Sequence, residues 1–467
     1  MDRNRYAPGL LLISSVILLG LGARYYLARM TNLDMAFQTF LILKSGSLEI
    51  QSGRFGAAVT QIWAWAAQEL GLSLKWVLRS YSMGHVIWPV LLAGLAWKWG
   101  QWRWAFVILL TATLLTTHTF FWLSEMPQGL VFICAIYAWM HAKGSVRQLV
   151  WWEWVLWMLA LWTAFYFHPM VLYANLFIGL FFVLESGKNR DWRIMHLISI
   201  GFFVLLAILK YKVMKLDWYD AAALKRQDAF AQLWPNWIDI ESNHRFWEWC
   251  SRDYWLLLLV LLAGIAWQIW HRKWTRALLV AGWSFGFVLL VNVPFHSDMG
   301  KQFYMENLYL PLAVFAAVPL MFEVLQKPAN QLSGFGLGLL SLIFTLNFTR
   351  ITKAGEEWQL RMLWEKQVLH QTANLPSGKI LMTEAQAPMD LLKMSWGSPY
   401  EWLLLSSLEH PDSARCLIIT PEPAKYDSLM ARPDLFLGTF RNYSLDSLPA
   451  RYFNVKDRNK GYTRISN

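Results

Sequence analysis

Long apolar runs recur along the first 350 residues, and they constrain the fold more than any other feature of the sequence. Of the 467 residues, 56% are hydrophobic and only 16% are charged, whereas a soluble protein is typically about 25% charged. A helix of about 20 apolar residues spans the hydrocarbon core of a bilayer. The chain is therefore predicted to be an α-helical, multi-pass membrane protein.

The length and periodicity of the apolar runs predict about eleven crossings. They are placed near residues 8–27, 77–97, 104–123, 128–142, 151–166, 168–185, 195–210, 254–271, 277–295, 304–324 and 333–349. Tryptophans gather where crossings begin or end, as in the aromatic belts of membrane proteins. No small-residue cleavage motif follows the first run, so we interpret it as a retained anchor and not a signal peptide.

The distribution of lysine and arginine predicts the orientation, because cytoplasmic loops are rich in these residues. With the N-terminus in the cytoplasm, the links on that side carry Arg3, Arg5, Lys98, Arg103, Lys143, Arg147, Lys188, Arg190, Arg193, Arg272, Lys273, Arg276 and Lys327. The opposite links near 118–128 and 166–169 carry none. The net charge of +11 follows from this pattern, and no basic run indicates a nucleic-acid partner.

The same orientation places the 28–76 loop, a tryptophan-rich 212–253 loop and residues 350–467 outside the cytoplasm, as expected for a bacterial inner-membrane protein. After Thr349 short strand-like runs, KILMTE and RCLIIT, flank a predicted helix, EWLLLSSL. We therefore predict a transmembrane domain, 1–349, and a small extracytoplasmic α/β domain, 350–467. The three cysteines have no metal-binding spacing, and nothing in the sequence supports a disulfide between Cys250 and Cys416.

Asp34 is the first candidate for a catalytic residue, because it lies just beyond the first crossing in a long semi-polar loop. Thr31 and Asp34 have the spacing of a capping box, so a helix is expected to begin near Leu33. A second surface helix is expected after Gly53, and both would lie along the membrane, with breaks at Gly46 and Gly53. Asp34 is then either a helix cap or a carboxylate that acts as a general base or cation ligand.

Glu125 is the second catalytic candidate, in the sequence FFWLSEMPQGL between the third and fourth crossings. A carboxylate at the mouth of a helical bundle is costly unless it is paired or functional, although a cap for the next helix is the alternative. His168 lies in a very short turn on the same side and is either a turn residue or a ligand. If the protein binds a divalent cation, Asp34 and Glu125 are its candidate ligands, and no other cofactor is indicated.

Four further residues are candidates for binding a substrate. Lys301 is the one basic residue in its outer turn, and Arg54 begins the second surface helix. Each side chain would either anchor a phosphate or extend to lipid headgroups. Glu306 and Tyr309 precede the apolar run of the tenth crossing, in YMENLYLPLAVF.

The order of these features resembles the GT-C superfamily of membrane glycosyltransferases, which use polyprenyl-phosphate-linked sugars. Asp34 stands where that family has its first catalytic carboxylate, and Glu125 where a second acidic residue often lies. YMENLYLPLAVF is similar to the (R/K)-Y-x-x-P entry into a late crossing, but Glu306 and Asn307 stand where an arginine is common. The resemblance covers residues 1–325 and departs from the family also in having a single aspartate in the first loop.

The resemblance implies roles for the candidate residues. Asp34 would deprotonate or orient the acceptor hydroxyl, while Lys301, Arg54 and His168 would hold the donor phosphate. The lipid tail would lie between the surface helices and the bundle, in contact with membrane lipids. Two alternatives remain: a non-catalytic membrane scaffold, in which Asp34 and Glu125 are dispensable, and a lipid-linked glycan transporter, which predicts charges near mid-membrane.

Overall fold

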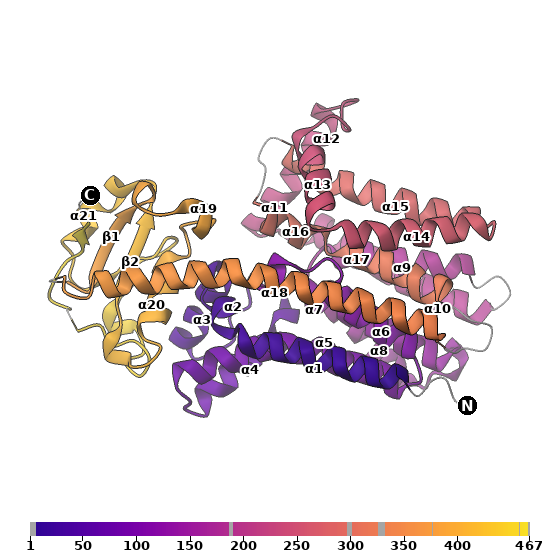
Figure 1. Cartoon of the computed structure of the whole chain (residues 1–467), viewed down its shortest axis with the longest axis horizontal. Helices are drawn as coiled ribbons and strands as arrows, with labels where there is room; N and C mark the ends of the chain where they lie inside the picture. Colours follow the sequence, from indigo (N-terminus) through magenta and orange to yellow (C-terminus); the bar gives the residue numbers. More distant parts are fainter. Residues whose placement is uncertain are drawn as a thin grey trace.

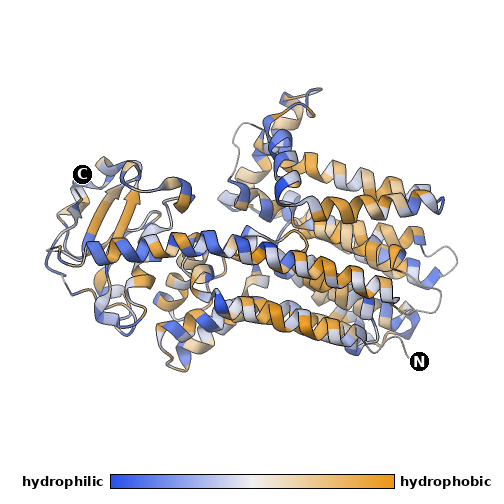
Figure 2. Ribbon diagram, viewed as in Figure 1, coloured by the Kyte–Doolittle hydropathy of each residue, from blue (hydrophilic) through white to orange (hydrophobic). Residues whose placement is uncertain are grey.

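The computed structural model describes residues 6–185, 190–296, 301–325, 332–375, 377–456 and 458–465. Within these ranges the chain forms a bundle of long helices and a separate α/β domain (Figure 1). The N-terminus lies at one end of the bundle, and the C-terminal domain lies beyond the opposite end (Figure 1). Figure 2 shows hydrophobic residues along the bundle helices and hydrophilic residues concentrated on the short helices at the domain end.

Each of the predicted crossings contains a helix in the structure. The helices are α1 (Tyr6–Arg24), α5 (Leu74–Lys98), α6 (Trp102–Thr113), α7 (Met126–Lys143), α8 (Trp151–Phe165), α9 (Val171–Glu185), α10 (Arg190–Ile208), α14 (Trp255–Trp270), α15 (Trp274–Asn292), α17 (Pro311–Pro319) and α18 (Gly334–Gln371). In the described part of the chain, four helices are long and apolar enough to cross a membrane by themselves, and six spans result if each of two bent helix pairs counts as one. These spans show an integral membrane protein, while the count of eleven stays a prediction.

The third predicted crossing, 104–123, is shorter than expected because α6 ends at Thr113. The following residues are held in a non-helical loop and a short 3₁₀ turn, η3 (His118–Phe120). The buried carboxylate of Glu306 accepts the backbone N–H groups of Thr117 and Thr119, at 2.7 and 2.8 Å. These amides are therefore satisfied by a side chain from another helix and need no helical partner.

Short helices cover the end of the bundle that faces the C-terminal domain (Figure 1). In the first loop they are α2 (Tyr26–Met30), α3 (Leu33–Ser45), η2 (Phe55–Ala57) and α4 (Ala58–Glu69). The predicted breaks are confirmed, because Gly46 and Gly53 have φ values of 69° and 65°. The 212–253 loop forms α11 (Trp218–Lys225), η6 (Arg226–Asp228), α12 (Ala229–Gln232) and α13 (Glu241–Arg252), and α16 (Gln302–Tyr309) precedes α17.

The C-terminal domain contains a small parallel sheet. Its strands β1 (Lys379–Thr383), β2 (Cys416–Thr420) and β5 (Thr463–Arg464) have the order β2-β1-β5, and β3 (Leu435–Phe436) pairs antiparallel with β4 (Tyr443–Ser444). The helices of the domain are α19 (Met389–Leu392), α20 (Ser398–Ser406) and α21 (Asp427–Met430). The predicted strands and the helix between them are therefore confirmed. In the whole protein, Cys134, Cys250 and Cys416 are buried free thiols.

The predicted boundary at residues 349–350 lies inside α18, which runs without interruption over 38 residues. This helix joins the bundle to the domain without a linker (Figure 1). The domain also packs on the first loop, because the ring of Phe40 in α3 lies 5.0 Å from the ring of Tyr400 and 5.4 Å from that of Phe436. The domain therefore fixes the helix that carries Asp34.

Candidate functional site

Asp34 lies in the first turn of α3, and its side chain is half-buried. The helix begins at Leu33, as predicted, but the expected cap is wrong. Asn32 is the N-terminal boundary residue and makes no side-chain capping bond, while the hydroxyl of Thr31 donates to the carbonyl of Leu27 at 2.8 Å. Asp34 Oδ2 instead accepts a hydrogen bond of 2.6 Å from Trp122 Nε1. The carboxyl group is thus aimed at the bundle and not at its own helix end.

The surroundings of Asp34 favour its neutral form more than water does. Loss of solvent raises the pKa of Asp34 from the ordinary 3.8 to about 7, and the nearby charge of Glu125 raises it as well. The Trp122 hydrogen bond and the charge of Arg54 act in the opposite direction. A carboxyl group with a pKa near 7 is an effective general base at neutral pH.

The start of α3 is held by the C-terminal domain. Leu33 has a φ of 37°, and Glu401 Oε1 accepts its backbone N–H at 2.5 Å. Arg361 of α18 binds both oxygens of Glu401, at 2.6 and 2.7 Å, and also contacts Glu365 at 3.2 Å. Burial and the charge of Glu401 raise the pKa of Glu365, so Arg361 is compensated mainly by Glu401. We call Leu33, Arg361, Glu365 and Glu401 the interdomain ion-pair cluster.

Glu125 pairs with Arg54 of the first loop. Arg54 NH1 lies 3.3 Å from Glu125 Oε2, and the two side chains are only 13% and 11% exposed. Glu125 is the boundary residue of α7, but its side chain makes no capping bond; Ser124 Oγ accepts the N–H of Met126 at 3.3 Å. The side-chain cap of α7 is therefore supplied by Ser124 and not by Glu125.

Asp34, Arg54 and Glu125 share one electrostatic environment, because the charges of the latter two change the pKa of Asp34. His168 also belongs to this neighbourhood: burial lowers its pKa, and the charges of Arg54 and Lys210 lower it further. Its Nδ1 accepts the N–H of Met170 at 3.2 Å, so it is a neutral turn residue beside the charged group. We call Asp34, Arg54, Glu125 and Trp122 the carboxyl site. That Asp34, Glu125 and His168 line one extracytoplasmic pocket stays a prediction.

Two predicted substrate-binding residues have structural contacts instead. Glu306 is completely buried and accepts hydrogen bonds from Thr117, from the amide and hydroxyl of Thr119, and from Tyr254 OH at 2.9 Å. Tyr309 is also completely buried and donates to Asn292 Oδ1. These contacts and the complete burial of both side chains leave no exposed surface for a ligand.

Among the described residues, Lys301 makes no hydrogen bond or ion pair with Asp34, Arg54 or Glu125. It is exposed at the beginning of α16, where it lines a cavity of about 450 Å³ together with His118, Arg350 and Lys393. Arg54, by contrast, contacts Glu125 and lies over the ring of Tyr219 at 5.2 Å. The two basic residues therefore have different contacts, and that both hold one phosphate stays a prediction.

Several residues near the carboxyl site were missed by the sequence analysis. Trp122 is the hydrogen-bond donor of Asp34, and Tyr219 contacts Arg54 from α11. Lys210 pairs with Asp220 at 2.7 Å, and their side chains are 11% and 6% exposed. A tryptophan in the same outer turn as Glu125 was the available signal for Trp122. Nothing local in the sequence marks Tyr219 or Asp220.

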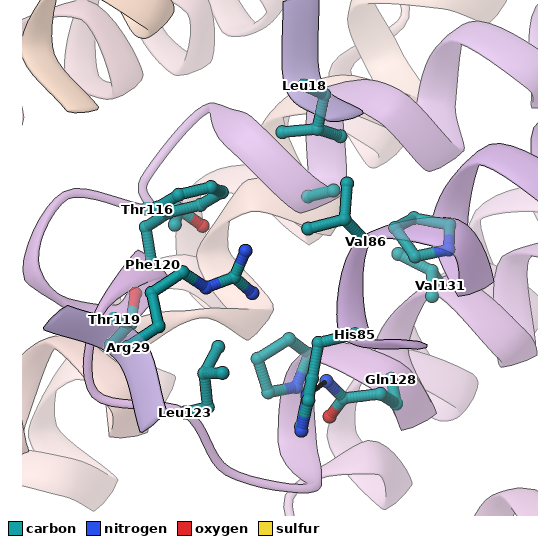
Figure 3. A pocket seen from close by; sticks show the side chains of 13 residues that line it. Leu18, Arg29, His85, Val86, Thr116, Thr119, Phe120, Leu123, Gln128 and Val131 are labelled. Atoms are coloured by element: carbon teal, nitrogen blue, oxygen red, sulfur yellow. Dashed lines mark hydrogen bonds between the residues drawn. The ribbon is translucent and has the colours of Figure 1, made fainter. Parts of the chain in front are cut away.

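A small second cavity of about 40 Å³ lies between α1, α2, α5 and α7 (Figure 3). Arg29 enters it from α2, opposite His85 and Gln128 (Figure 3). Arg29 is 1% exposed, its guanidinium lies 4.3 Å from the centre of the Phe120 ring, and its Nε and NH1 have no partner among the described residues. The volume holds about three waters at most. It is too small for a sugar.

The carboxyl site does not fit a divalent cation. The described residues contain no group of three or more histidine, cysteine or carboxylate side chains that could ligate a metal. Arg54 already pairs with Glu125, and the Trp122 N–H already occupies Asp34 Oδ2. We therefore assign no step of the chemistry to a cation.

The fold and the site define an integral membrane protein with a helical bundle, an α/β domain at one end, and a carboxyl site between them. No known family profile and no curated protein sequence matches the chain. Among solved structures it is similar to the crystal structure of ArnT from Cupriavidus metallidurans bound to undecaprenyl phosphate, with 11% identity and a TM-score of 0.40 over 88% of this chain and 86% of ArnT. A similarity at that level carries no conclusion about activity.

Proposed function

We propose that this protein is a membrane glycosyltransferase that transfers a sugar from a polyprenyl-phosphate-linked donor to an extracytoplasmic acceptor, either a lipid-linked glycan or a protein. The observation that carries the proposal is Asp34: a half-buried carboxyl group with a pKa of about 7, held by Trp122 at the end of a membrane bundle. Burial of a carboxyl group without a full ion pair costs stability, so it is expected mainly where chemistry needs it. The resemblance of the residue order to that of the GT-C superfamily supports the reaction class.

In this proposal Asp34 accepts the proton of the acceptor hydroxyl as that oxygen attacks the anomeric carbon of the sugar. The bond between this carbon and the phosphate oxygen breaks, and the polyprenyl phosphate leaves with the bonding electrons. Arg54 supplies positive charge beside the reacting groups, and Glu125 orients the guanidinium through their 3.3 Å ion pair. Trp122 fixes the carboxyl group of Asp34, and the interdomain ion-pair cluster fixes the start of its helix.

Asp34→Asn tests the proposal. The asparagine keeps the size of the side chain and an oxygen that accepts the Trp122 hydrogen bond, but it removes the base. Transfer from a polyprenyl-phosphate sugar, measured with radiolabelled donor in proteoliposomes, should fall by about 100-fold or more. Wild-type transfer should increase with pH up to about pH 7 and then level off, because only ionised Asp34 accepts a proton.

An exposed aspartate provides the matched control, since Asp239 has a side chain that is 90% exposed. Asp239→Asn should transfer sugar at the wild-type rate. Full transfer by the Asp34→Asn variant would contradict the assignment of the base and would favour the non-catalytic scaffold.

A further inference from the structure

A second ligand site is indicated by the cavity of about 450 Å³ at the junction of the bundle and the C-terminal domain. It is lined by residues from η3, the start of α16, the middle of α18, and Lys393 just after α19. In Figure 1, α19 lies on the side of the domain that faces α16. Binding sites for small molecules typically have volumes of about 300–1,000 Å³, so this cavity has the size of a headgroup site.

The walls of this cavity carry more positive than negative charge. Five cationic side chains, those of Arg252, Lys301, Arg350, Lys353 and Lys393, face two carboxylates, those of Asp253 and Glu357. Arg252 and Asp253 neutralise each other at 2.8 Å. In the ranges that the structure describes, Lys301, Lys353 and Lys393 form no ion pair. Like charges that share a cavity repel one another unless an anion compensates them.

Two fixed polar groups also lack partners at this cavity. Arg350 is held by the backbone carbonyls of Asp253 and Leu114, at 2.9 and 2.6 Å, while its Nε is buried and has no partner among the described residues. His118 Nδ1 is buried without a partner in the same part of the structure. A buried N–H without a hydrogen bond is costly, so an acceptor is expected at Arg350 Nε. A rigid arginine between flexible lysines is an arrangement that suits phosphate.

We propose that this cavity, which we call the basic cleft, binds an anionic headgroup that carries a phosphate on a sugar-sized group. In this proposal Lys301, Lys353 and Lys393 neutralise the phosphate. Two classes of molecule carry such a group: soluble phosphorylated sugars and anionic membrane lipids. The experiment below distinguishes them.

The basic cleft and the carboxyl site are linked by the contact between two aromatic side chains. Phe303 lines the cleft, and its ring is 4.6 Å from the ring of Trp122, which donates to Asp34. The rings of Phe303 and Trp122 therefore connect the cleft to Asp34. On the basis of the proposed function, we assign a lipid-borne headgroup bound in the cleft as that of the lipid-linked glycan that accepts the sugar. The binding itself does not depend on that function.

The test is direct binding to the full-length protein in phosphatidylcholine nanodiscs, measured by isothermal titration calorimetry. Glucose 1-phosphate is the probe, and glucose is the neutral control. We expect glucose 1-phosphate alone to bind, and its affinity to fall at least 10-fold in the double variant Lys353→Gln, Lys393→Gln. Lys366→Gln is the matched control, because Lys366 is an exposed lysine on the same helix outside the cleft. It should bind as the wild type does.

The lipid source is tested in nanodiscs rich in phosphatidylglycerol. If the natural occupant is a lipid headgroup, phosphatidylglycerol should displace glucose 1-phosphate from the wild-type protein or bind in its place. Absence of binding in both arms, or equal affinities of the double variant and the wild type, would overturn the proposal. Both lysine variants change only exposed or half-exposed side chains, and a size-exclusion profile like that of the wild type verifies that they fold.

Asp34→Asn separates this inference from the proposed function, because Asp34 does not line the cleft. The variant should bind glucose 1-phosphate as the wild type does. Binding together with full transfer by Asp34→Asn would leave the cleft standing and remove the proposed base. Loss of transfer in Asp34→Asn without any binding of the probe would keep the base and overturn the cleft.

Discussion

Replacing Asp34 with asparagine should stabilise the protein increasingly as the pH rises. The pKa of Asp34 rises from 3.8 to about 7 on folding, because burial disfavours the ionised form. Each pKa unit corresponds to about 1.36 kcal/mol, so ionised Asp34 costs about 4 kcal/mol of folding free energy well above pH 7. This value is an upper limit, because the side chain is only half-buried.

The sign follows from proton binding. Between about pH 4 and pH 7 the folded protein holds the Asp34 proton more tightly than the unfolded chain does, so stability falls as the pH rises through this window. Asparagine does not titrate and has no such loss. Between about pH 5 and pH 8 the variant should therefore gain about 2–3 kcal/mol in unfolding free energy relative to the wild type.

Thermal unfolding of the detergent-solubilised protein measures this gain. With an unfolding entropy of about 2.1 cal/mol/K per residue, the difference in Tm between variant and wild type should increase by about 2–3 °C from pH 5 to pH 8. Asp239→Asn should show no such increase, because its carboxylate is exposed. A difference that decreases with pH would mean that ionised Asp34 is stabilised by folding, and it would refute the argument from desolvation.

Three other perturbations follow from the site geometry. Arg361→Ala should destabilise the protein by about 3–5 kcal/mol in thermal unfolding, because it leaves buried Glu401 without its cation, and a wild-type Tm would contradict this. Arg29→Met should leave stability unchanged or raise it by about 1–3 kcal/mol, since the buried Nε and NH1 have no partner, and a large loss of Tm would show that an unseen acceptor satisfies them. Chelation with EDTA should leave sugar transfer unchanged, because Arg54 pairs with Glu125 and Trp122 donates to Asp34. A loss of transfer that Mg²⁺ restores would refute the assignment of these contacts in place of a cation.

Contiguous residues determined much of the architecture. The apolar runs located each bundle helix, because a helix in lipid must satisfy its own backbone and present apolar side chains over its whole length. Glycines that adopt positive φ marked the breaks in the first loop at Gly46 and Gly53. Alternating composition likewise located β1, β2 and α20. Thr31 and Asp34 indicated the beginning of α3 correctly although neither caps it.

The chemistry of the candidate site was decided by tertiary structure. The donor to Asp34 is Trp122, 88 residues later in the chain, and the acceptor of the Leu33 N–H is Glu401, 368 residues later. The sequence suggested that Glu306 binds a ligand, but in the folded chain its carboxylate accepts hydrogen bonds from Thr117, Thr119 and Tyr254. A pKa, an ion pair or a cavity depends on which distant groups remove water and supply charge. Sequence periodicity reports only which face of a segment is buried, so the different contacts of Lys301 and Arg54 became visible only in the folded chain.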